Sequence, residues 1–389
     1  MRFSSPIALW FLAVACAPAT QVAAPPAPAP APAPLPPAPV IAEPAPVPPP
    51  PPTPEEQKAA EEKRKLEADW QKLEREHAAE LARLTPELRA KVKALVEAPN
   101  PNLKAILAGP QRRPGHAERD AARHPKETLE FFGIKPNSTV LEYGPGDGWY
   151  TELIAPFVAK SGKLYVTATD PTGPKDQRSS YYGYRTKLFL EALPEAYSKV
   201  ELLVIDPKAP KLPESTFDAV VLMRGAHGMN NNKQLAPWLA EFHKALKPKG
   251  VLAIEQHRAL PGKNPDETSK QGYLSESFVI EAAEQAGFKL AAKSEINANP
   301  KDTRDHPDGV WSLPPTLRGG DKDREKYTAI GESDRMTLKF TKREQKPAKA
   351  AAAPAAPKAP TAAMSAAPKA PAAATPAPAA PAAPKPAKP

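Results

Sequence analysis

Short apolar runs recur through the middle of the chain, and each has the length of a β-strand. They fall at 140–142, 163–169, 200–205, 217–223, 251–255, 288–294 and 335–341. In the last run Met336, Leu338 and Phe340 alternate with polar residues. That alternation predicts an antiparallel strand pair at the edge of a sheet.

Between these runs the apolar residues recur at helical spacing. Residues 232–246 place Leu235, Trp238, Leu239, Phe242 and Leu246 on one helical face. A second helix is predicted over 278–286, where Gly287 suits the left-handed position that ends a helix. A third is predicted over 119–132. Strands that alternate with helices predict an α/β fold with a doubly wound sheet.

Residues 55–98 are charged and have a helical pattern. One stripe of the predicted helix over 55–84 consists of Leu66, Trp70, Leu73, His77, Leu81 and Leu84. Thr85 and Pro86 predict the cap and first position of a second helix, which runs to Ala98. The stripe suits either a short coiled coil that joins two copies or a helix packed on the domain, and both alternatives stay open.

The first apolar run ends in an acid and a glycine-rich turn, with Glu142 followed by Gly144, Gly146 and Gly148. Glycines at a strand-to-helix turn let the backbone approach a nucleoside-like ligand, because a side chain there would block it. The spacing G-x-G-x-G differs from the dinucleotide fingerprint G-x-G-x-x-G. It resembles motif I of the class I S-adenosylmethionine-dependent methyltransferases. This resemblance implies that the acid and the three glycines bind S-adenosylmethionine.

Two further acids follow strands in the order of that family. Asp170 ends the second run, where a carboxylate accepts hydrogen bonds from both ribose hydroxyls of a nucleotide. Asp206 ends the third run, and the resemblance implies an adenine contact there. The run at 217–223 and the element Leu-Lys-Pro-Lys-Gly at 246–250 are similar to the family's fourth and fifth strands.

The resemblance extends over about 99–343 and is closest to a bacterial group of predicted methyltransferases, many of which carry export signals. The phrases that carry it lie at 119–125, 148–152, 256–259 and 332–336. It implies seven strands with the last one antiparallel, and S-adenosylmethionine as cofactor. It names no acceptor, so an unidentified small molecule is the expected substrate.

Several basic residues are placed where an acceptor would arrive. His227 and His257 follow the fourth and fifth strands, at the sheet edge where open α/β folds bind ligands, and are the candidate catalytic bases. The neighbouring Arg224 and Arg258 are candidates for binding an anionic acceptor through their guanidinium groups. Arg123 and His124 precede the glycine turn and are expected near the acceptor side. The long segment 296–333, with Trp311 and Arg318, is expected to shape the acceptor pocket.

The N-terminus has the pattern of an export signal. Arg2 precedes an apolar run at 7–15, which is too short to span a bilayer and suits a signal peptide. The run stops at Ala-Val-Ala-Cys, which resembles a bacterial lipobox, and Cys16 is the only cysteine. Residues 1–16 are therefore expected to be a lipoprotein signal with Cys16 as the lipidated residue. Residue Ala17 is compatible with sorting to the outer membrane, so a lipid-anchored envelope protein is expected.

Both flanks of the folded part are low in complexity. Residues 17–54 are rich in Pro and Ala and predict an extended spacer. Residues 346–389 combine Ala and Pro with six lysines and no acid, and they supply most of the net charge of +9. Such a tail predicts disorder and contact with polyanions, or else only a soluble spacer. It lacks the aromatic residues and motif of sequence-specific nucleic-acid binding.

The predicted organisation is thus signal 1–16, linker 17–54, helical segment 55–98, methyltransferase-like domain 99–345 and tail 346–389. Export conflicts with a cofactor made in the cytoplasm, so a non-catalytic envelope lipoprotein that uses the domain for binding is the alternative. A nicotinamide-dependent dehydrogenase is disfavoured by the glycine spacing. The scattered histidines predict no metal site.

Overall fold

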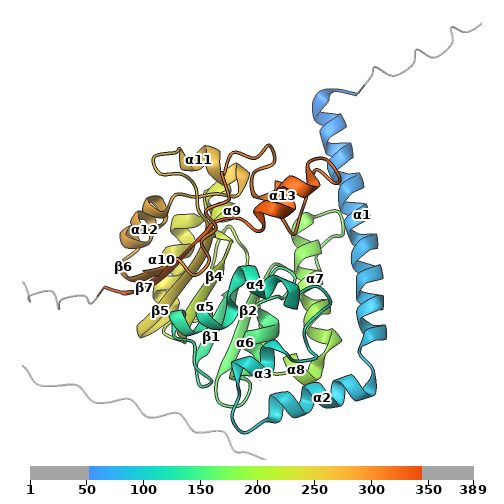
Figure 1. The fold of residues 1–389 in the computed structure, drawn as a ribbon, viewed down its shortest axis with the longest axis vertical. Coiled ribbons are helices and arrows are strands. Elements are labelled where there is room, and N and C mark those ends of the chain that lie inside the picture. The colour runs from blue at the N-terminus through green and yellow to red at the C-terminus, as the bar shows by residue number, and fades with distance from the viewer. Residues whose placement is uncertain (1–51, 344–389) are drawn as a thin grey trace, which may run out of the picture. The chain divides into compact units, whose positions relative to one another are not determined.

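The computed structural model describes residues 52–343, and its centre is one seven-stranded sheet (Figure 1). The strand order is β3-β2-β1-β4-β5-β7-β6. The strands are β1 (Thr139–Tyr143), β2 (Lys163–Ala168), β3 (Glu201–Val204), β4 (Phe217–Met223), β5 (Leu246–His257), β6 (Phe288–Ser294) and β7 (Arg335–Lys342). All seven predicted strands are present, which confirms the doubly wound α/β fold.

The first five strands are parallel, and β7 is antiparallel to both β5 and β6. Strand β7 lies inside the sheet, so the edge position belongs to β6. The order of strands reverses between β1 and β4, because the chain passes first to β2 and β3 and then returns to the other side. Open α/β sheets bind ligands at such a reversal, beyond the carboxyl ends of the strands.

Alternate residues along the strands supply two separate cores. On β1, Val140 packs on one face and Leu141 on the other. The first face is covered by α2 (Pro86–Glu97), α3 (Leu103–Leu107), α5 (Pro125–Phe132), α6 (Thr151–Val158), α7 (Arg178–Ala192) and α8 (Pro194–Tyr197). The second is covered by α9 (Ala226–Asn231), α10 (Leu235–Ala245) and α12 (Glu276–Gln285). Both faces are apolar because helices exclude water from each.

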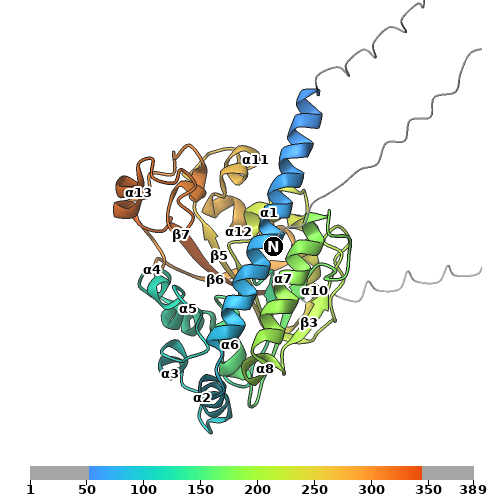
Figure 2. The same ribbon diagram turned by 90° about the vertical axis from the view of Figure 1, so that its right-hand side faces the viewer.

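The N-terminal helix α1 (Pro54–Arg83) packs on α7 rather than only facing solvent (Figure 2). Trp70 contacts Tyr181 and Tyr184, with ring centroids 5.4 and 5.3 Å apart, and its indole N–H donates to the carbonyl of Lys175 at 2.9 Å. Of the two alternatives for this stripe, the structure shows the docked helix. Leu81 stays 45% exposed, whereas the neighbouring Glu80 is buried and pairs with Arg83.

The helix predicted over 119–132 is interrupted, which corrects that expectation. A short α4 (Asp120–Arg123) ends at His124, which adopts a left-handed conformation with φ of 40°, and α5 then begins at Pro125. The residue before a proline is disfavoured in a helix because the proline ring clashes with its backbone, and this ends α4. The helix predicted at 232–246 begins later, at Leu235.

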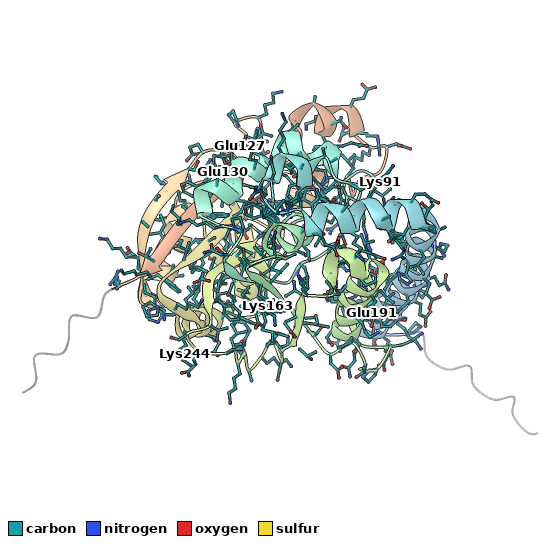
Figure 3. The ribbon with its side chains drawn as sticks, turned by 90° about the horizontal axis from the view of Figure 1, so that it is seen from below. Lys91, Glu127, Glu130, Lys163, Glu191 and Lys244 are labelled. Carbon is teal, nitrogen blue, oxygen red and sulfur yellow. The ribbon has the colours of Figure 1, made fainter. Side chains whose placement is uncertain are left out.

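The segment between β6 and β7 holds a 3₁₀ turn, Gly309–Ser312, and the short helix α13 (Arg324–Ile330). Further short elements are 3₁₀ turns at Ala117–Arg119 and Ser269–Gln271 and the helix α11 (Pro265–Thr268). Charged side chains such as Glu130 and Glu191 cover the outer surface and pair with lysines four residues before them (Figure 3). Exposed pairs of this kind contribute little to stability.

The predicted signal, Cys16, nearly all of the linker and the tail at 346–389 lie outside the described residues. Within 52–343, none of the helices has the length and apolar character needed to cross a membrane.

Candidate functional site

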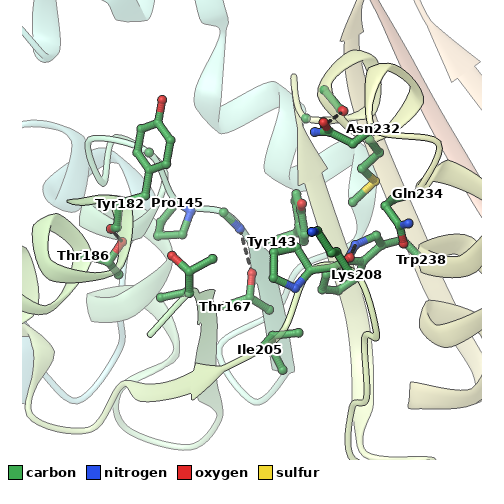
Figure 4. A pocket seen from close by; sticks show the side chains of 18 of the residues that line it. Tyr143, Pro145, Thr167, Tyr182, Thr186, Ile205, Lys208, Asn232, Gln234 and Trp238 are labelled. Atoms are coloured by element: carbon green, nitrogen blue, oxygen red, sulfur yellow. Dashed lines mark hydrogen bonds between the residues drawn. The ribbon is translucent and has the colours of Figure 1, made fainter. Parts of the chain in front are cut away.

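A cavity of about 650 Å³ opens at the carboxyl ends of β1, β2, β3 and β4 (Figure 4). Its wall combines the glycine turn, the end of β2, α7, the segment after β3, and α9 with the start of α10. Among the residues that line it are Tyr143, Gly144, Gly146, Thr167, Thr169, Tyr182, Arg185, Thr186, Ile205, Lys208, Gly225, Gly228, Met229, Asn232 and Trp238. This size lies within the range of small-molecule and cofactor sites.

The glycine turn leaves open space on the cavity side. Gly144 and Gly146 have φ of 54° and 63°, and a Cβ built on either would meet no heavy atom within 4 Å. Gly148, with φ of 82°, differs, because its Cβ would overlap the ring of Phe189 on α7. The first two glycines therefore keep backbone accessible to a ligand, and the third permits close packing of α7.

The acids expected at the nucleoside end are adjacent to the cavity lining and are not part of it. Asp170 is exposed and accepts hydrogen bonds from the Thr172 amide at 2.8 Å and hydroxyl at 2.7 Å, which hold the pKa of Asp170 below its usual value. Asp206 accepts from the Lys208 amide at 2.9 Å. Their neighbours Thr169 and Ile205 line the cavity. Ribose and adenine contacts by the two acids stay predictions.

Residues 116–293 match the sequence model of a methyltransferase domain family. The matched segment contains the glycine turn, the first five strands and most of the cavity wall. This part of the chain is similar to that family and has the fold of a class I methyltransferase domain. Its cofactor is S-adenosylmethionine, and the open glycine backbone and the cavity volume fit a nucleoside cofactor.

A curated relative is the ubiquinone/menaquinone biosynthesis C-methyltransferase UbiE of Hydrogenovibrio crunogenus, which is 26% identical over 129 residues. That alignment covers 33% of this chain and 46% of the relative, so the chain spans about half the length of the curated protein it matches. Solved structures with similarity include an S-adenosylmethionine-dependent methyltransferase from Aquifex aeolicus, with 19% identity, a TM-score of 0.39, and coverage of 62% of this chain and 99% of that chain.

Glu142, at the end of β1 in the methyltransferase domain, is buried beneath the glycine turn. Its carboxyl accepts a hydrogen bond from the Thr151 hydroxyl at 2.7 Å. Burial raises the pKa of Glu142 to about 7, against the opposing effects of Thr151 and Arg224. Glu142 is not among the residues that line the cavity. Its predicted role in orienting the cofactor stays a prediction.

The two predicted histidines come together beyond β4 and β5. Their ring centroids are 6.0 Å apart, and Trp311 lies 6.0 Å from His227. Burial lowers the pKa of both rings, and for His257 the nearby His227 and Arg224 add to the effect. Both imidazoles are therefore neutral at pH 7. The long 296–333 segment contributes Trp311 to this group, and Arg318 stacks over Trp311 at 4.8 Å.

The hydrogen bonds distinguish the two histidines. The Gln256 amide donates to Gly272 O at 2.8 Å and lies 3.3 Å from His227 Nδ1, which makes Nδ1 an acceptor and places the proton on Nε2. Nδ1 of His257 lies 2.5 Å from the Ser333 hydroxyl. When that Nδ1–H donates to Ser333, Nε2 of His257 is the basic nitrogen.

Arg258 does not face an acceptor, which corrects its predicted role. Its guanidinium donates to Asp334, Glu295 and Glu276 at distances of 2.6 to 3.2 Å. These bonds use all five N–H groups that an arginine carries. Arg258 therefore anchors the segment after β6 to the end of β5, and it has no donor left for substrate.

Arg123 is buried within the protein, and His124 is half-buried. Arg123 is 3% exposed, stacks on Trp149 at 4.9 Å and donates to Glu332 at 2.8 Å. Nη1 of Arg123 and Nδ1 of His124 are buried without a hydrogen-bond partner among the described residues. Arg123 is therefore not exposed to an acceptor, which corrects its predicted role, and the acceptor contact of His124 stays a prediction.

A buried network of charged residues, which the sequence did not predict, lies beside the glycine turn. Glu255, at the end of β5, accepts from the Tyr150 hydroxyl at 2.8 Å and lies 3.3 Å from Arg335 Nε and 3.4 Å from Arg224 Nη1. Arg335 also donates to Glu332 at 2.6 Å. The sequence signal for this network is the presence of charged residues at the ends of apolar strands, since apolar packing does not explain charges there.

Proposed function

We propose that the protein transfers the methyl group of S-adenosylmethionine to a small-molecule acceptor. The observation that carries this proposal is the cavity beside an open glycine turn in a methyltransferase domain. When bound, the cofactor supplies an electrophilic methyl group. The residues then have to hold donor and acceptor in line, and such positioning provides a large part of the acceleration.

The histidine pair supplies the proton chemistry in this proposal. An acceptor hydroxyl or acid loses its proton as it attacks, and a neutral imidazole has a free ring nitrogen that can take that proton. Nε2 of His257 takes the proton, and Nε2–H of His227 holds the acceptor by donating a hydrogen bond. The indole ring of Trp311 packs beside His227 in this arrangement.

Transfer of tritiated methyl from labelled S-adenosylmethionine to acid-soluble bacterial metabolites tests the proposal. Label should appear in a small molecule with the wild-type protein. It should fall at least a hundredfold with His257→Gln, because glutamine is similar in size to histidine and cannot act as the base. Arg343→Gln is the control, because Arg343 is exposed and pairs with Glu284 at the far end of β7. If the wild-type protein transfers no label, the result counts against the proposal that it is a methyltransferase.

We also propose that the chain is anchored in the cell envelope through Cys16, with the outer membrane as the favoured site. The support is the sequence at 1–17 alone. Metabolic labelling with a fatty acid should mark the wild-type chain and leave Cys16→Ser unlabelled. Equal labelling of both chains, or of neither, would reject the anchor. The non-catalytic alternative requires a folded domain that binds no S-adenosylmethionine.

A further inference from the structure

Four arginines and two glutamates form a connected group at the carboxyl edge of the sheet. Its members are Arg119, Arg123, Arg224, Glu255, Glu332 and Arg335. Glu332 binds three of the guanidinium groups, and Glu255 binds Arg335 and Arg224. The group therefore carries two more positive than negative charges, within a region where most members are buried.

Arg119 and Arg224, the two members at the ends of this group, carry N–H donors without a partner among residues 52–343. Arg119 donates to Glu332 only through Nε, at 3.2 Å, and Arg224 reaches Glu255 only through Nη1, at 3.4 Å. Their remaining N–H groups form no hydrogen bond with residues 52–343. The two side chains are 21% and 20% exposed, so both reach solvent from a largely buried base.

The neighbouring acids are paired with other arginines or are only partly ionised. Asp147 is engaged by Arg185 at 2.9 Å, and Asp120 by Arg112 at 2.8 Å. Glu142, with its pKa raised to about 7, contributes only a partial negative charge at neutral pH. Burial lowers the pKa of Arg119, and the nearby charge of Arg224 lowers it further, against the opposing effects of Glu332 and Asp147.

The charged group lies near the cofactor cavity and the histidine pair in the chain. Arg224 directly follows β4 and precedes Gly225, which lines the cofactor cavity. His227 lies two residues beyond Gly225, and Tyr150 links Glu255 to the glycine turn. Arg224 is therefore close in the chain both to the cavity lining and to His227.

We propose that Arg119 and Arg224 form a subsite for a doubly charged oxyanion group, a phosphate monoester or a dicarboxylate, on the acceptor. Guanidinium forks bind both groups through paired N–H bonds. This inference rests on the proposed function for the identity of the acceptor, and the anion subsite itself is testable separately. The sequence predicted that Arg224 and Arg258 bind an anionic acceptor, and in this proposal Arg119 has that role in place of Arg258.

The test titrates sodium phosphate, and in a second arm sodium malonate, into the full chain saturated with S-adenosylhomocysteine. Sodium chloride at equal ionic strength corrects for screening. Binding is followed by calorimetry, and the affinity for S-adenosylhomocysteine is measured separately for each protein. Arg119→Gln, Arg224→Gln and the control Arg343→Gln are compared with wild type.

Saturable binding of either anion to wild type and to the control, weakened at least tenfold by each of the other substitutions, is the expected result. The affinity for S-adenosylhomocysteine should change by less than twofold. The proposal is overturned if wild type binds neither anion saturably, if both substitutions leave binding unchanged, or if they abolish cofactor binding instead. Should Arg224→Gln fail to fold, Arg119→Gln decides, because Arg119 lies outside the sheet.

Failure of the proposed function gives a different pattern. Wild-type protein that does not bind S-adenosylhomocysteine, yet binds the anion through both arginines, would retain the subsite and reject methyl transfer.

Discussion

The hydroxyl of Tyr150 donates a hydrogen bond to Oε2 of Glu255 across 2.8 Å, and it joins the glycine turn to the end of β5. Glu255 is completely buried, so the loss of this donor would leave a carboxylate oxygen poorly satisfied. We predict that Tyr150→Phe lowers the free energy of unfolding by about 1–3 kcal/mol. Urea denaturation measures the change.

Tyr197→Phe is the matched control, because Tyr197 is equally buried and its hydroxyl forms no hydrogen bond within 52–343. Its removal should cost less than about 1 kcal/mol. Equal effects of the two substitutions would mean that the bond to Glu255 does not contribute to stability.

The contact of Trp70 with α7 is predicted to support cofactor binding indirectly. Tyr181 and Tyr184 face Trp70, whereas Tyr182 and Thr186 of the same helix line the cavity. Trp70→Ala should release α1, raise its susceptibility to trypsin, and weaken S-adenosylhomocysteine binding severalfold because α7 loses a supporting surface.

Leu81→Ala on the exposed side of α1 provides the comparison and should leave both proteolysis and affinity unchanged. Restoration by Trp70→Phe would show that apolar packing is what matters. An unaltered digestion pattern in Trp70→Ala would show that α1 is not held by this contact.

Glu142 makes stability depend on pH. Its pKa is raised from 4.5 to about 7 in the folded protein, so between these values the folded state binds more protons than the unfolded state. Its contribution to stability is present below about pH 4.5 and is lost as the pH rises towards 7 and beyond. At 1.36 kcal/mol for each pH unit, the loss is up to about 3 kcal/mol.

Denaturation at a series of pH values checks this prediction. Glu142→Gln cannot ionise and should lose less stability than wild type between pH 4.5 and 7.5. Parallel curves for the two proteins would mean that Glu142 is already ionised at low pH in the folded state.

The histidine pair should remain neutral at neutral pH. Because burial lowers the pKa of both rings, NMR titration should place both midpoints below 6.5. Assignment relies on His227→Gln and His257→Gln. A midpoint above 6.5 for His257 would conflict with its role as a base that is free at pH 7.

Local pattern predicted the scaffold because strands and helices follow from apolar spacing. The runs at 217–223 and 288–294 became β4 and β6 with the same bounds. The break at His124 was missed because the amphipathic spacing continues through Pro125, and it is proline sterics that end the helix.

The side chains around the site were harder to predict than the strands. His257 ends β5 and His227 follows β4, and parallel strands end at the same edge of a sheet. The sequence was therefore sufficient to predict that the two histidines lie close together. The partners of Arg258 come from the residue after β6, from α12 and from the residue before β7, and their convergence depends on tertiary packing. Arg119 was not singled out for the same reason, because its partner Glu332 lies 213 residues away.

Calorimetric titration of S-adenosylmethionine and S-adenosylhomocysteine into the full chain tests the central claim most directly. We predict micromolar binding that Asp170→Asn weakens at least tenfold, or about 1.4 kcal/mol. Asp176→Asn in the same exposed loop should have no effect. Folded wild-type protein that binds neither compound, or that prefers a nicotinamide dinucleotide, would contradict the account.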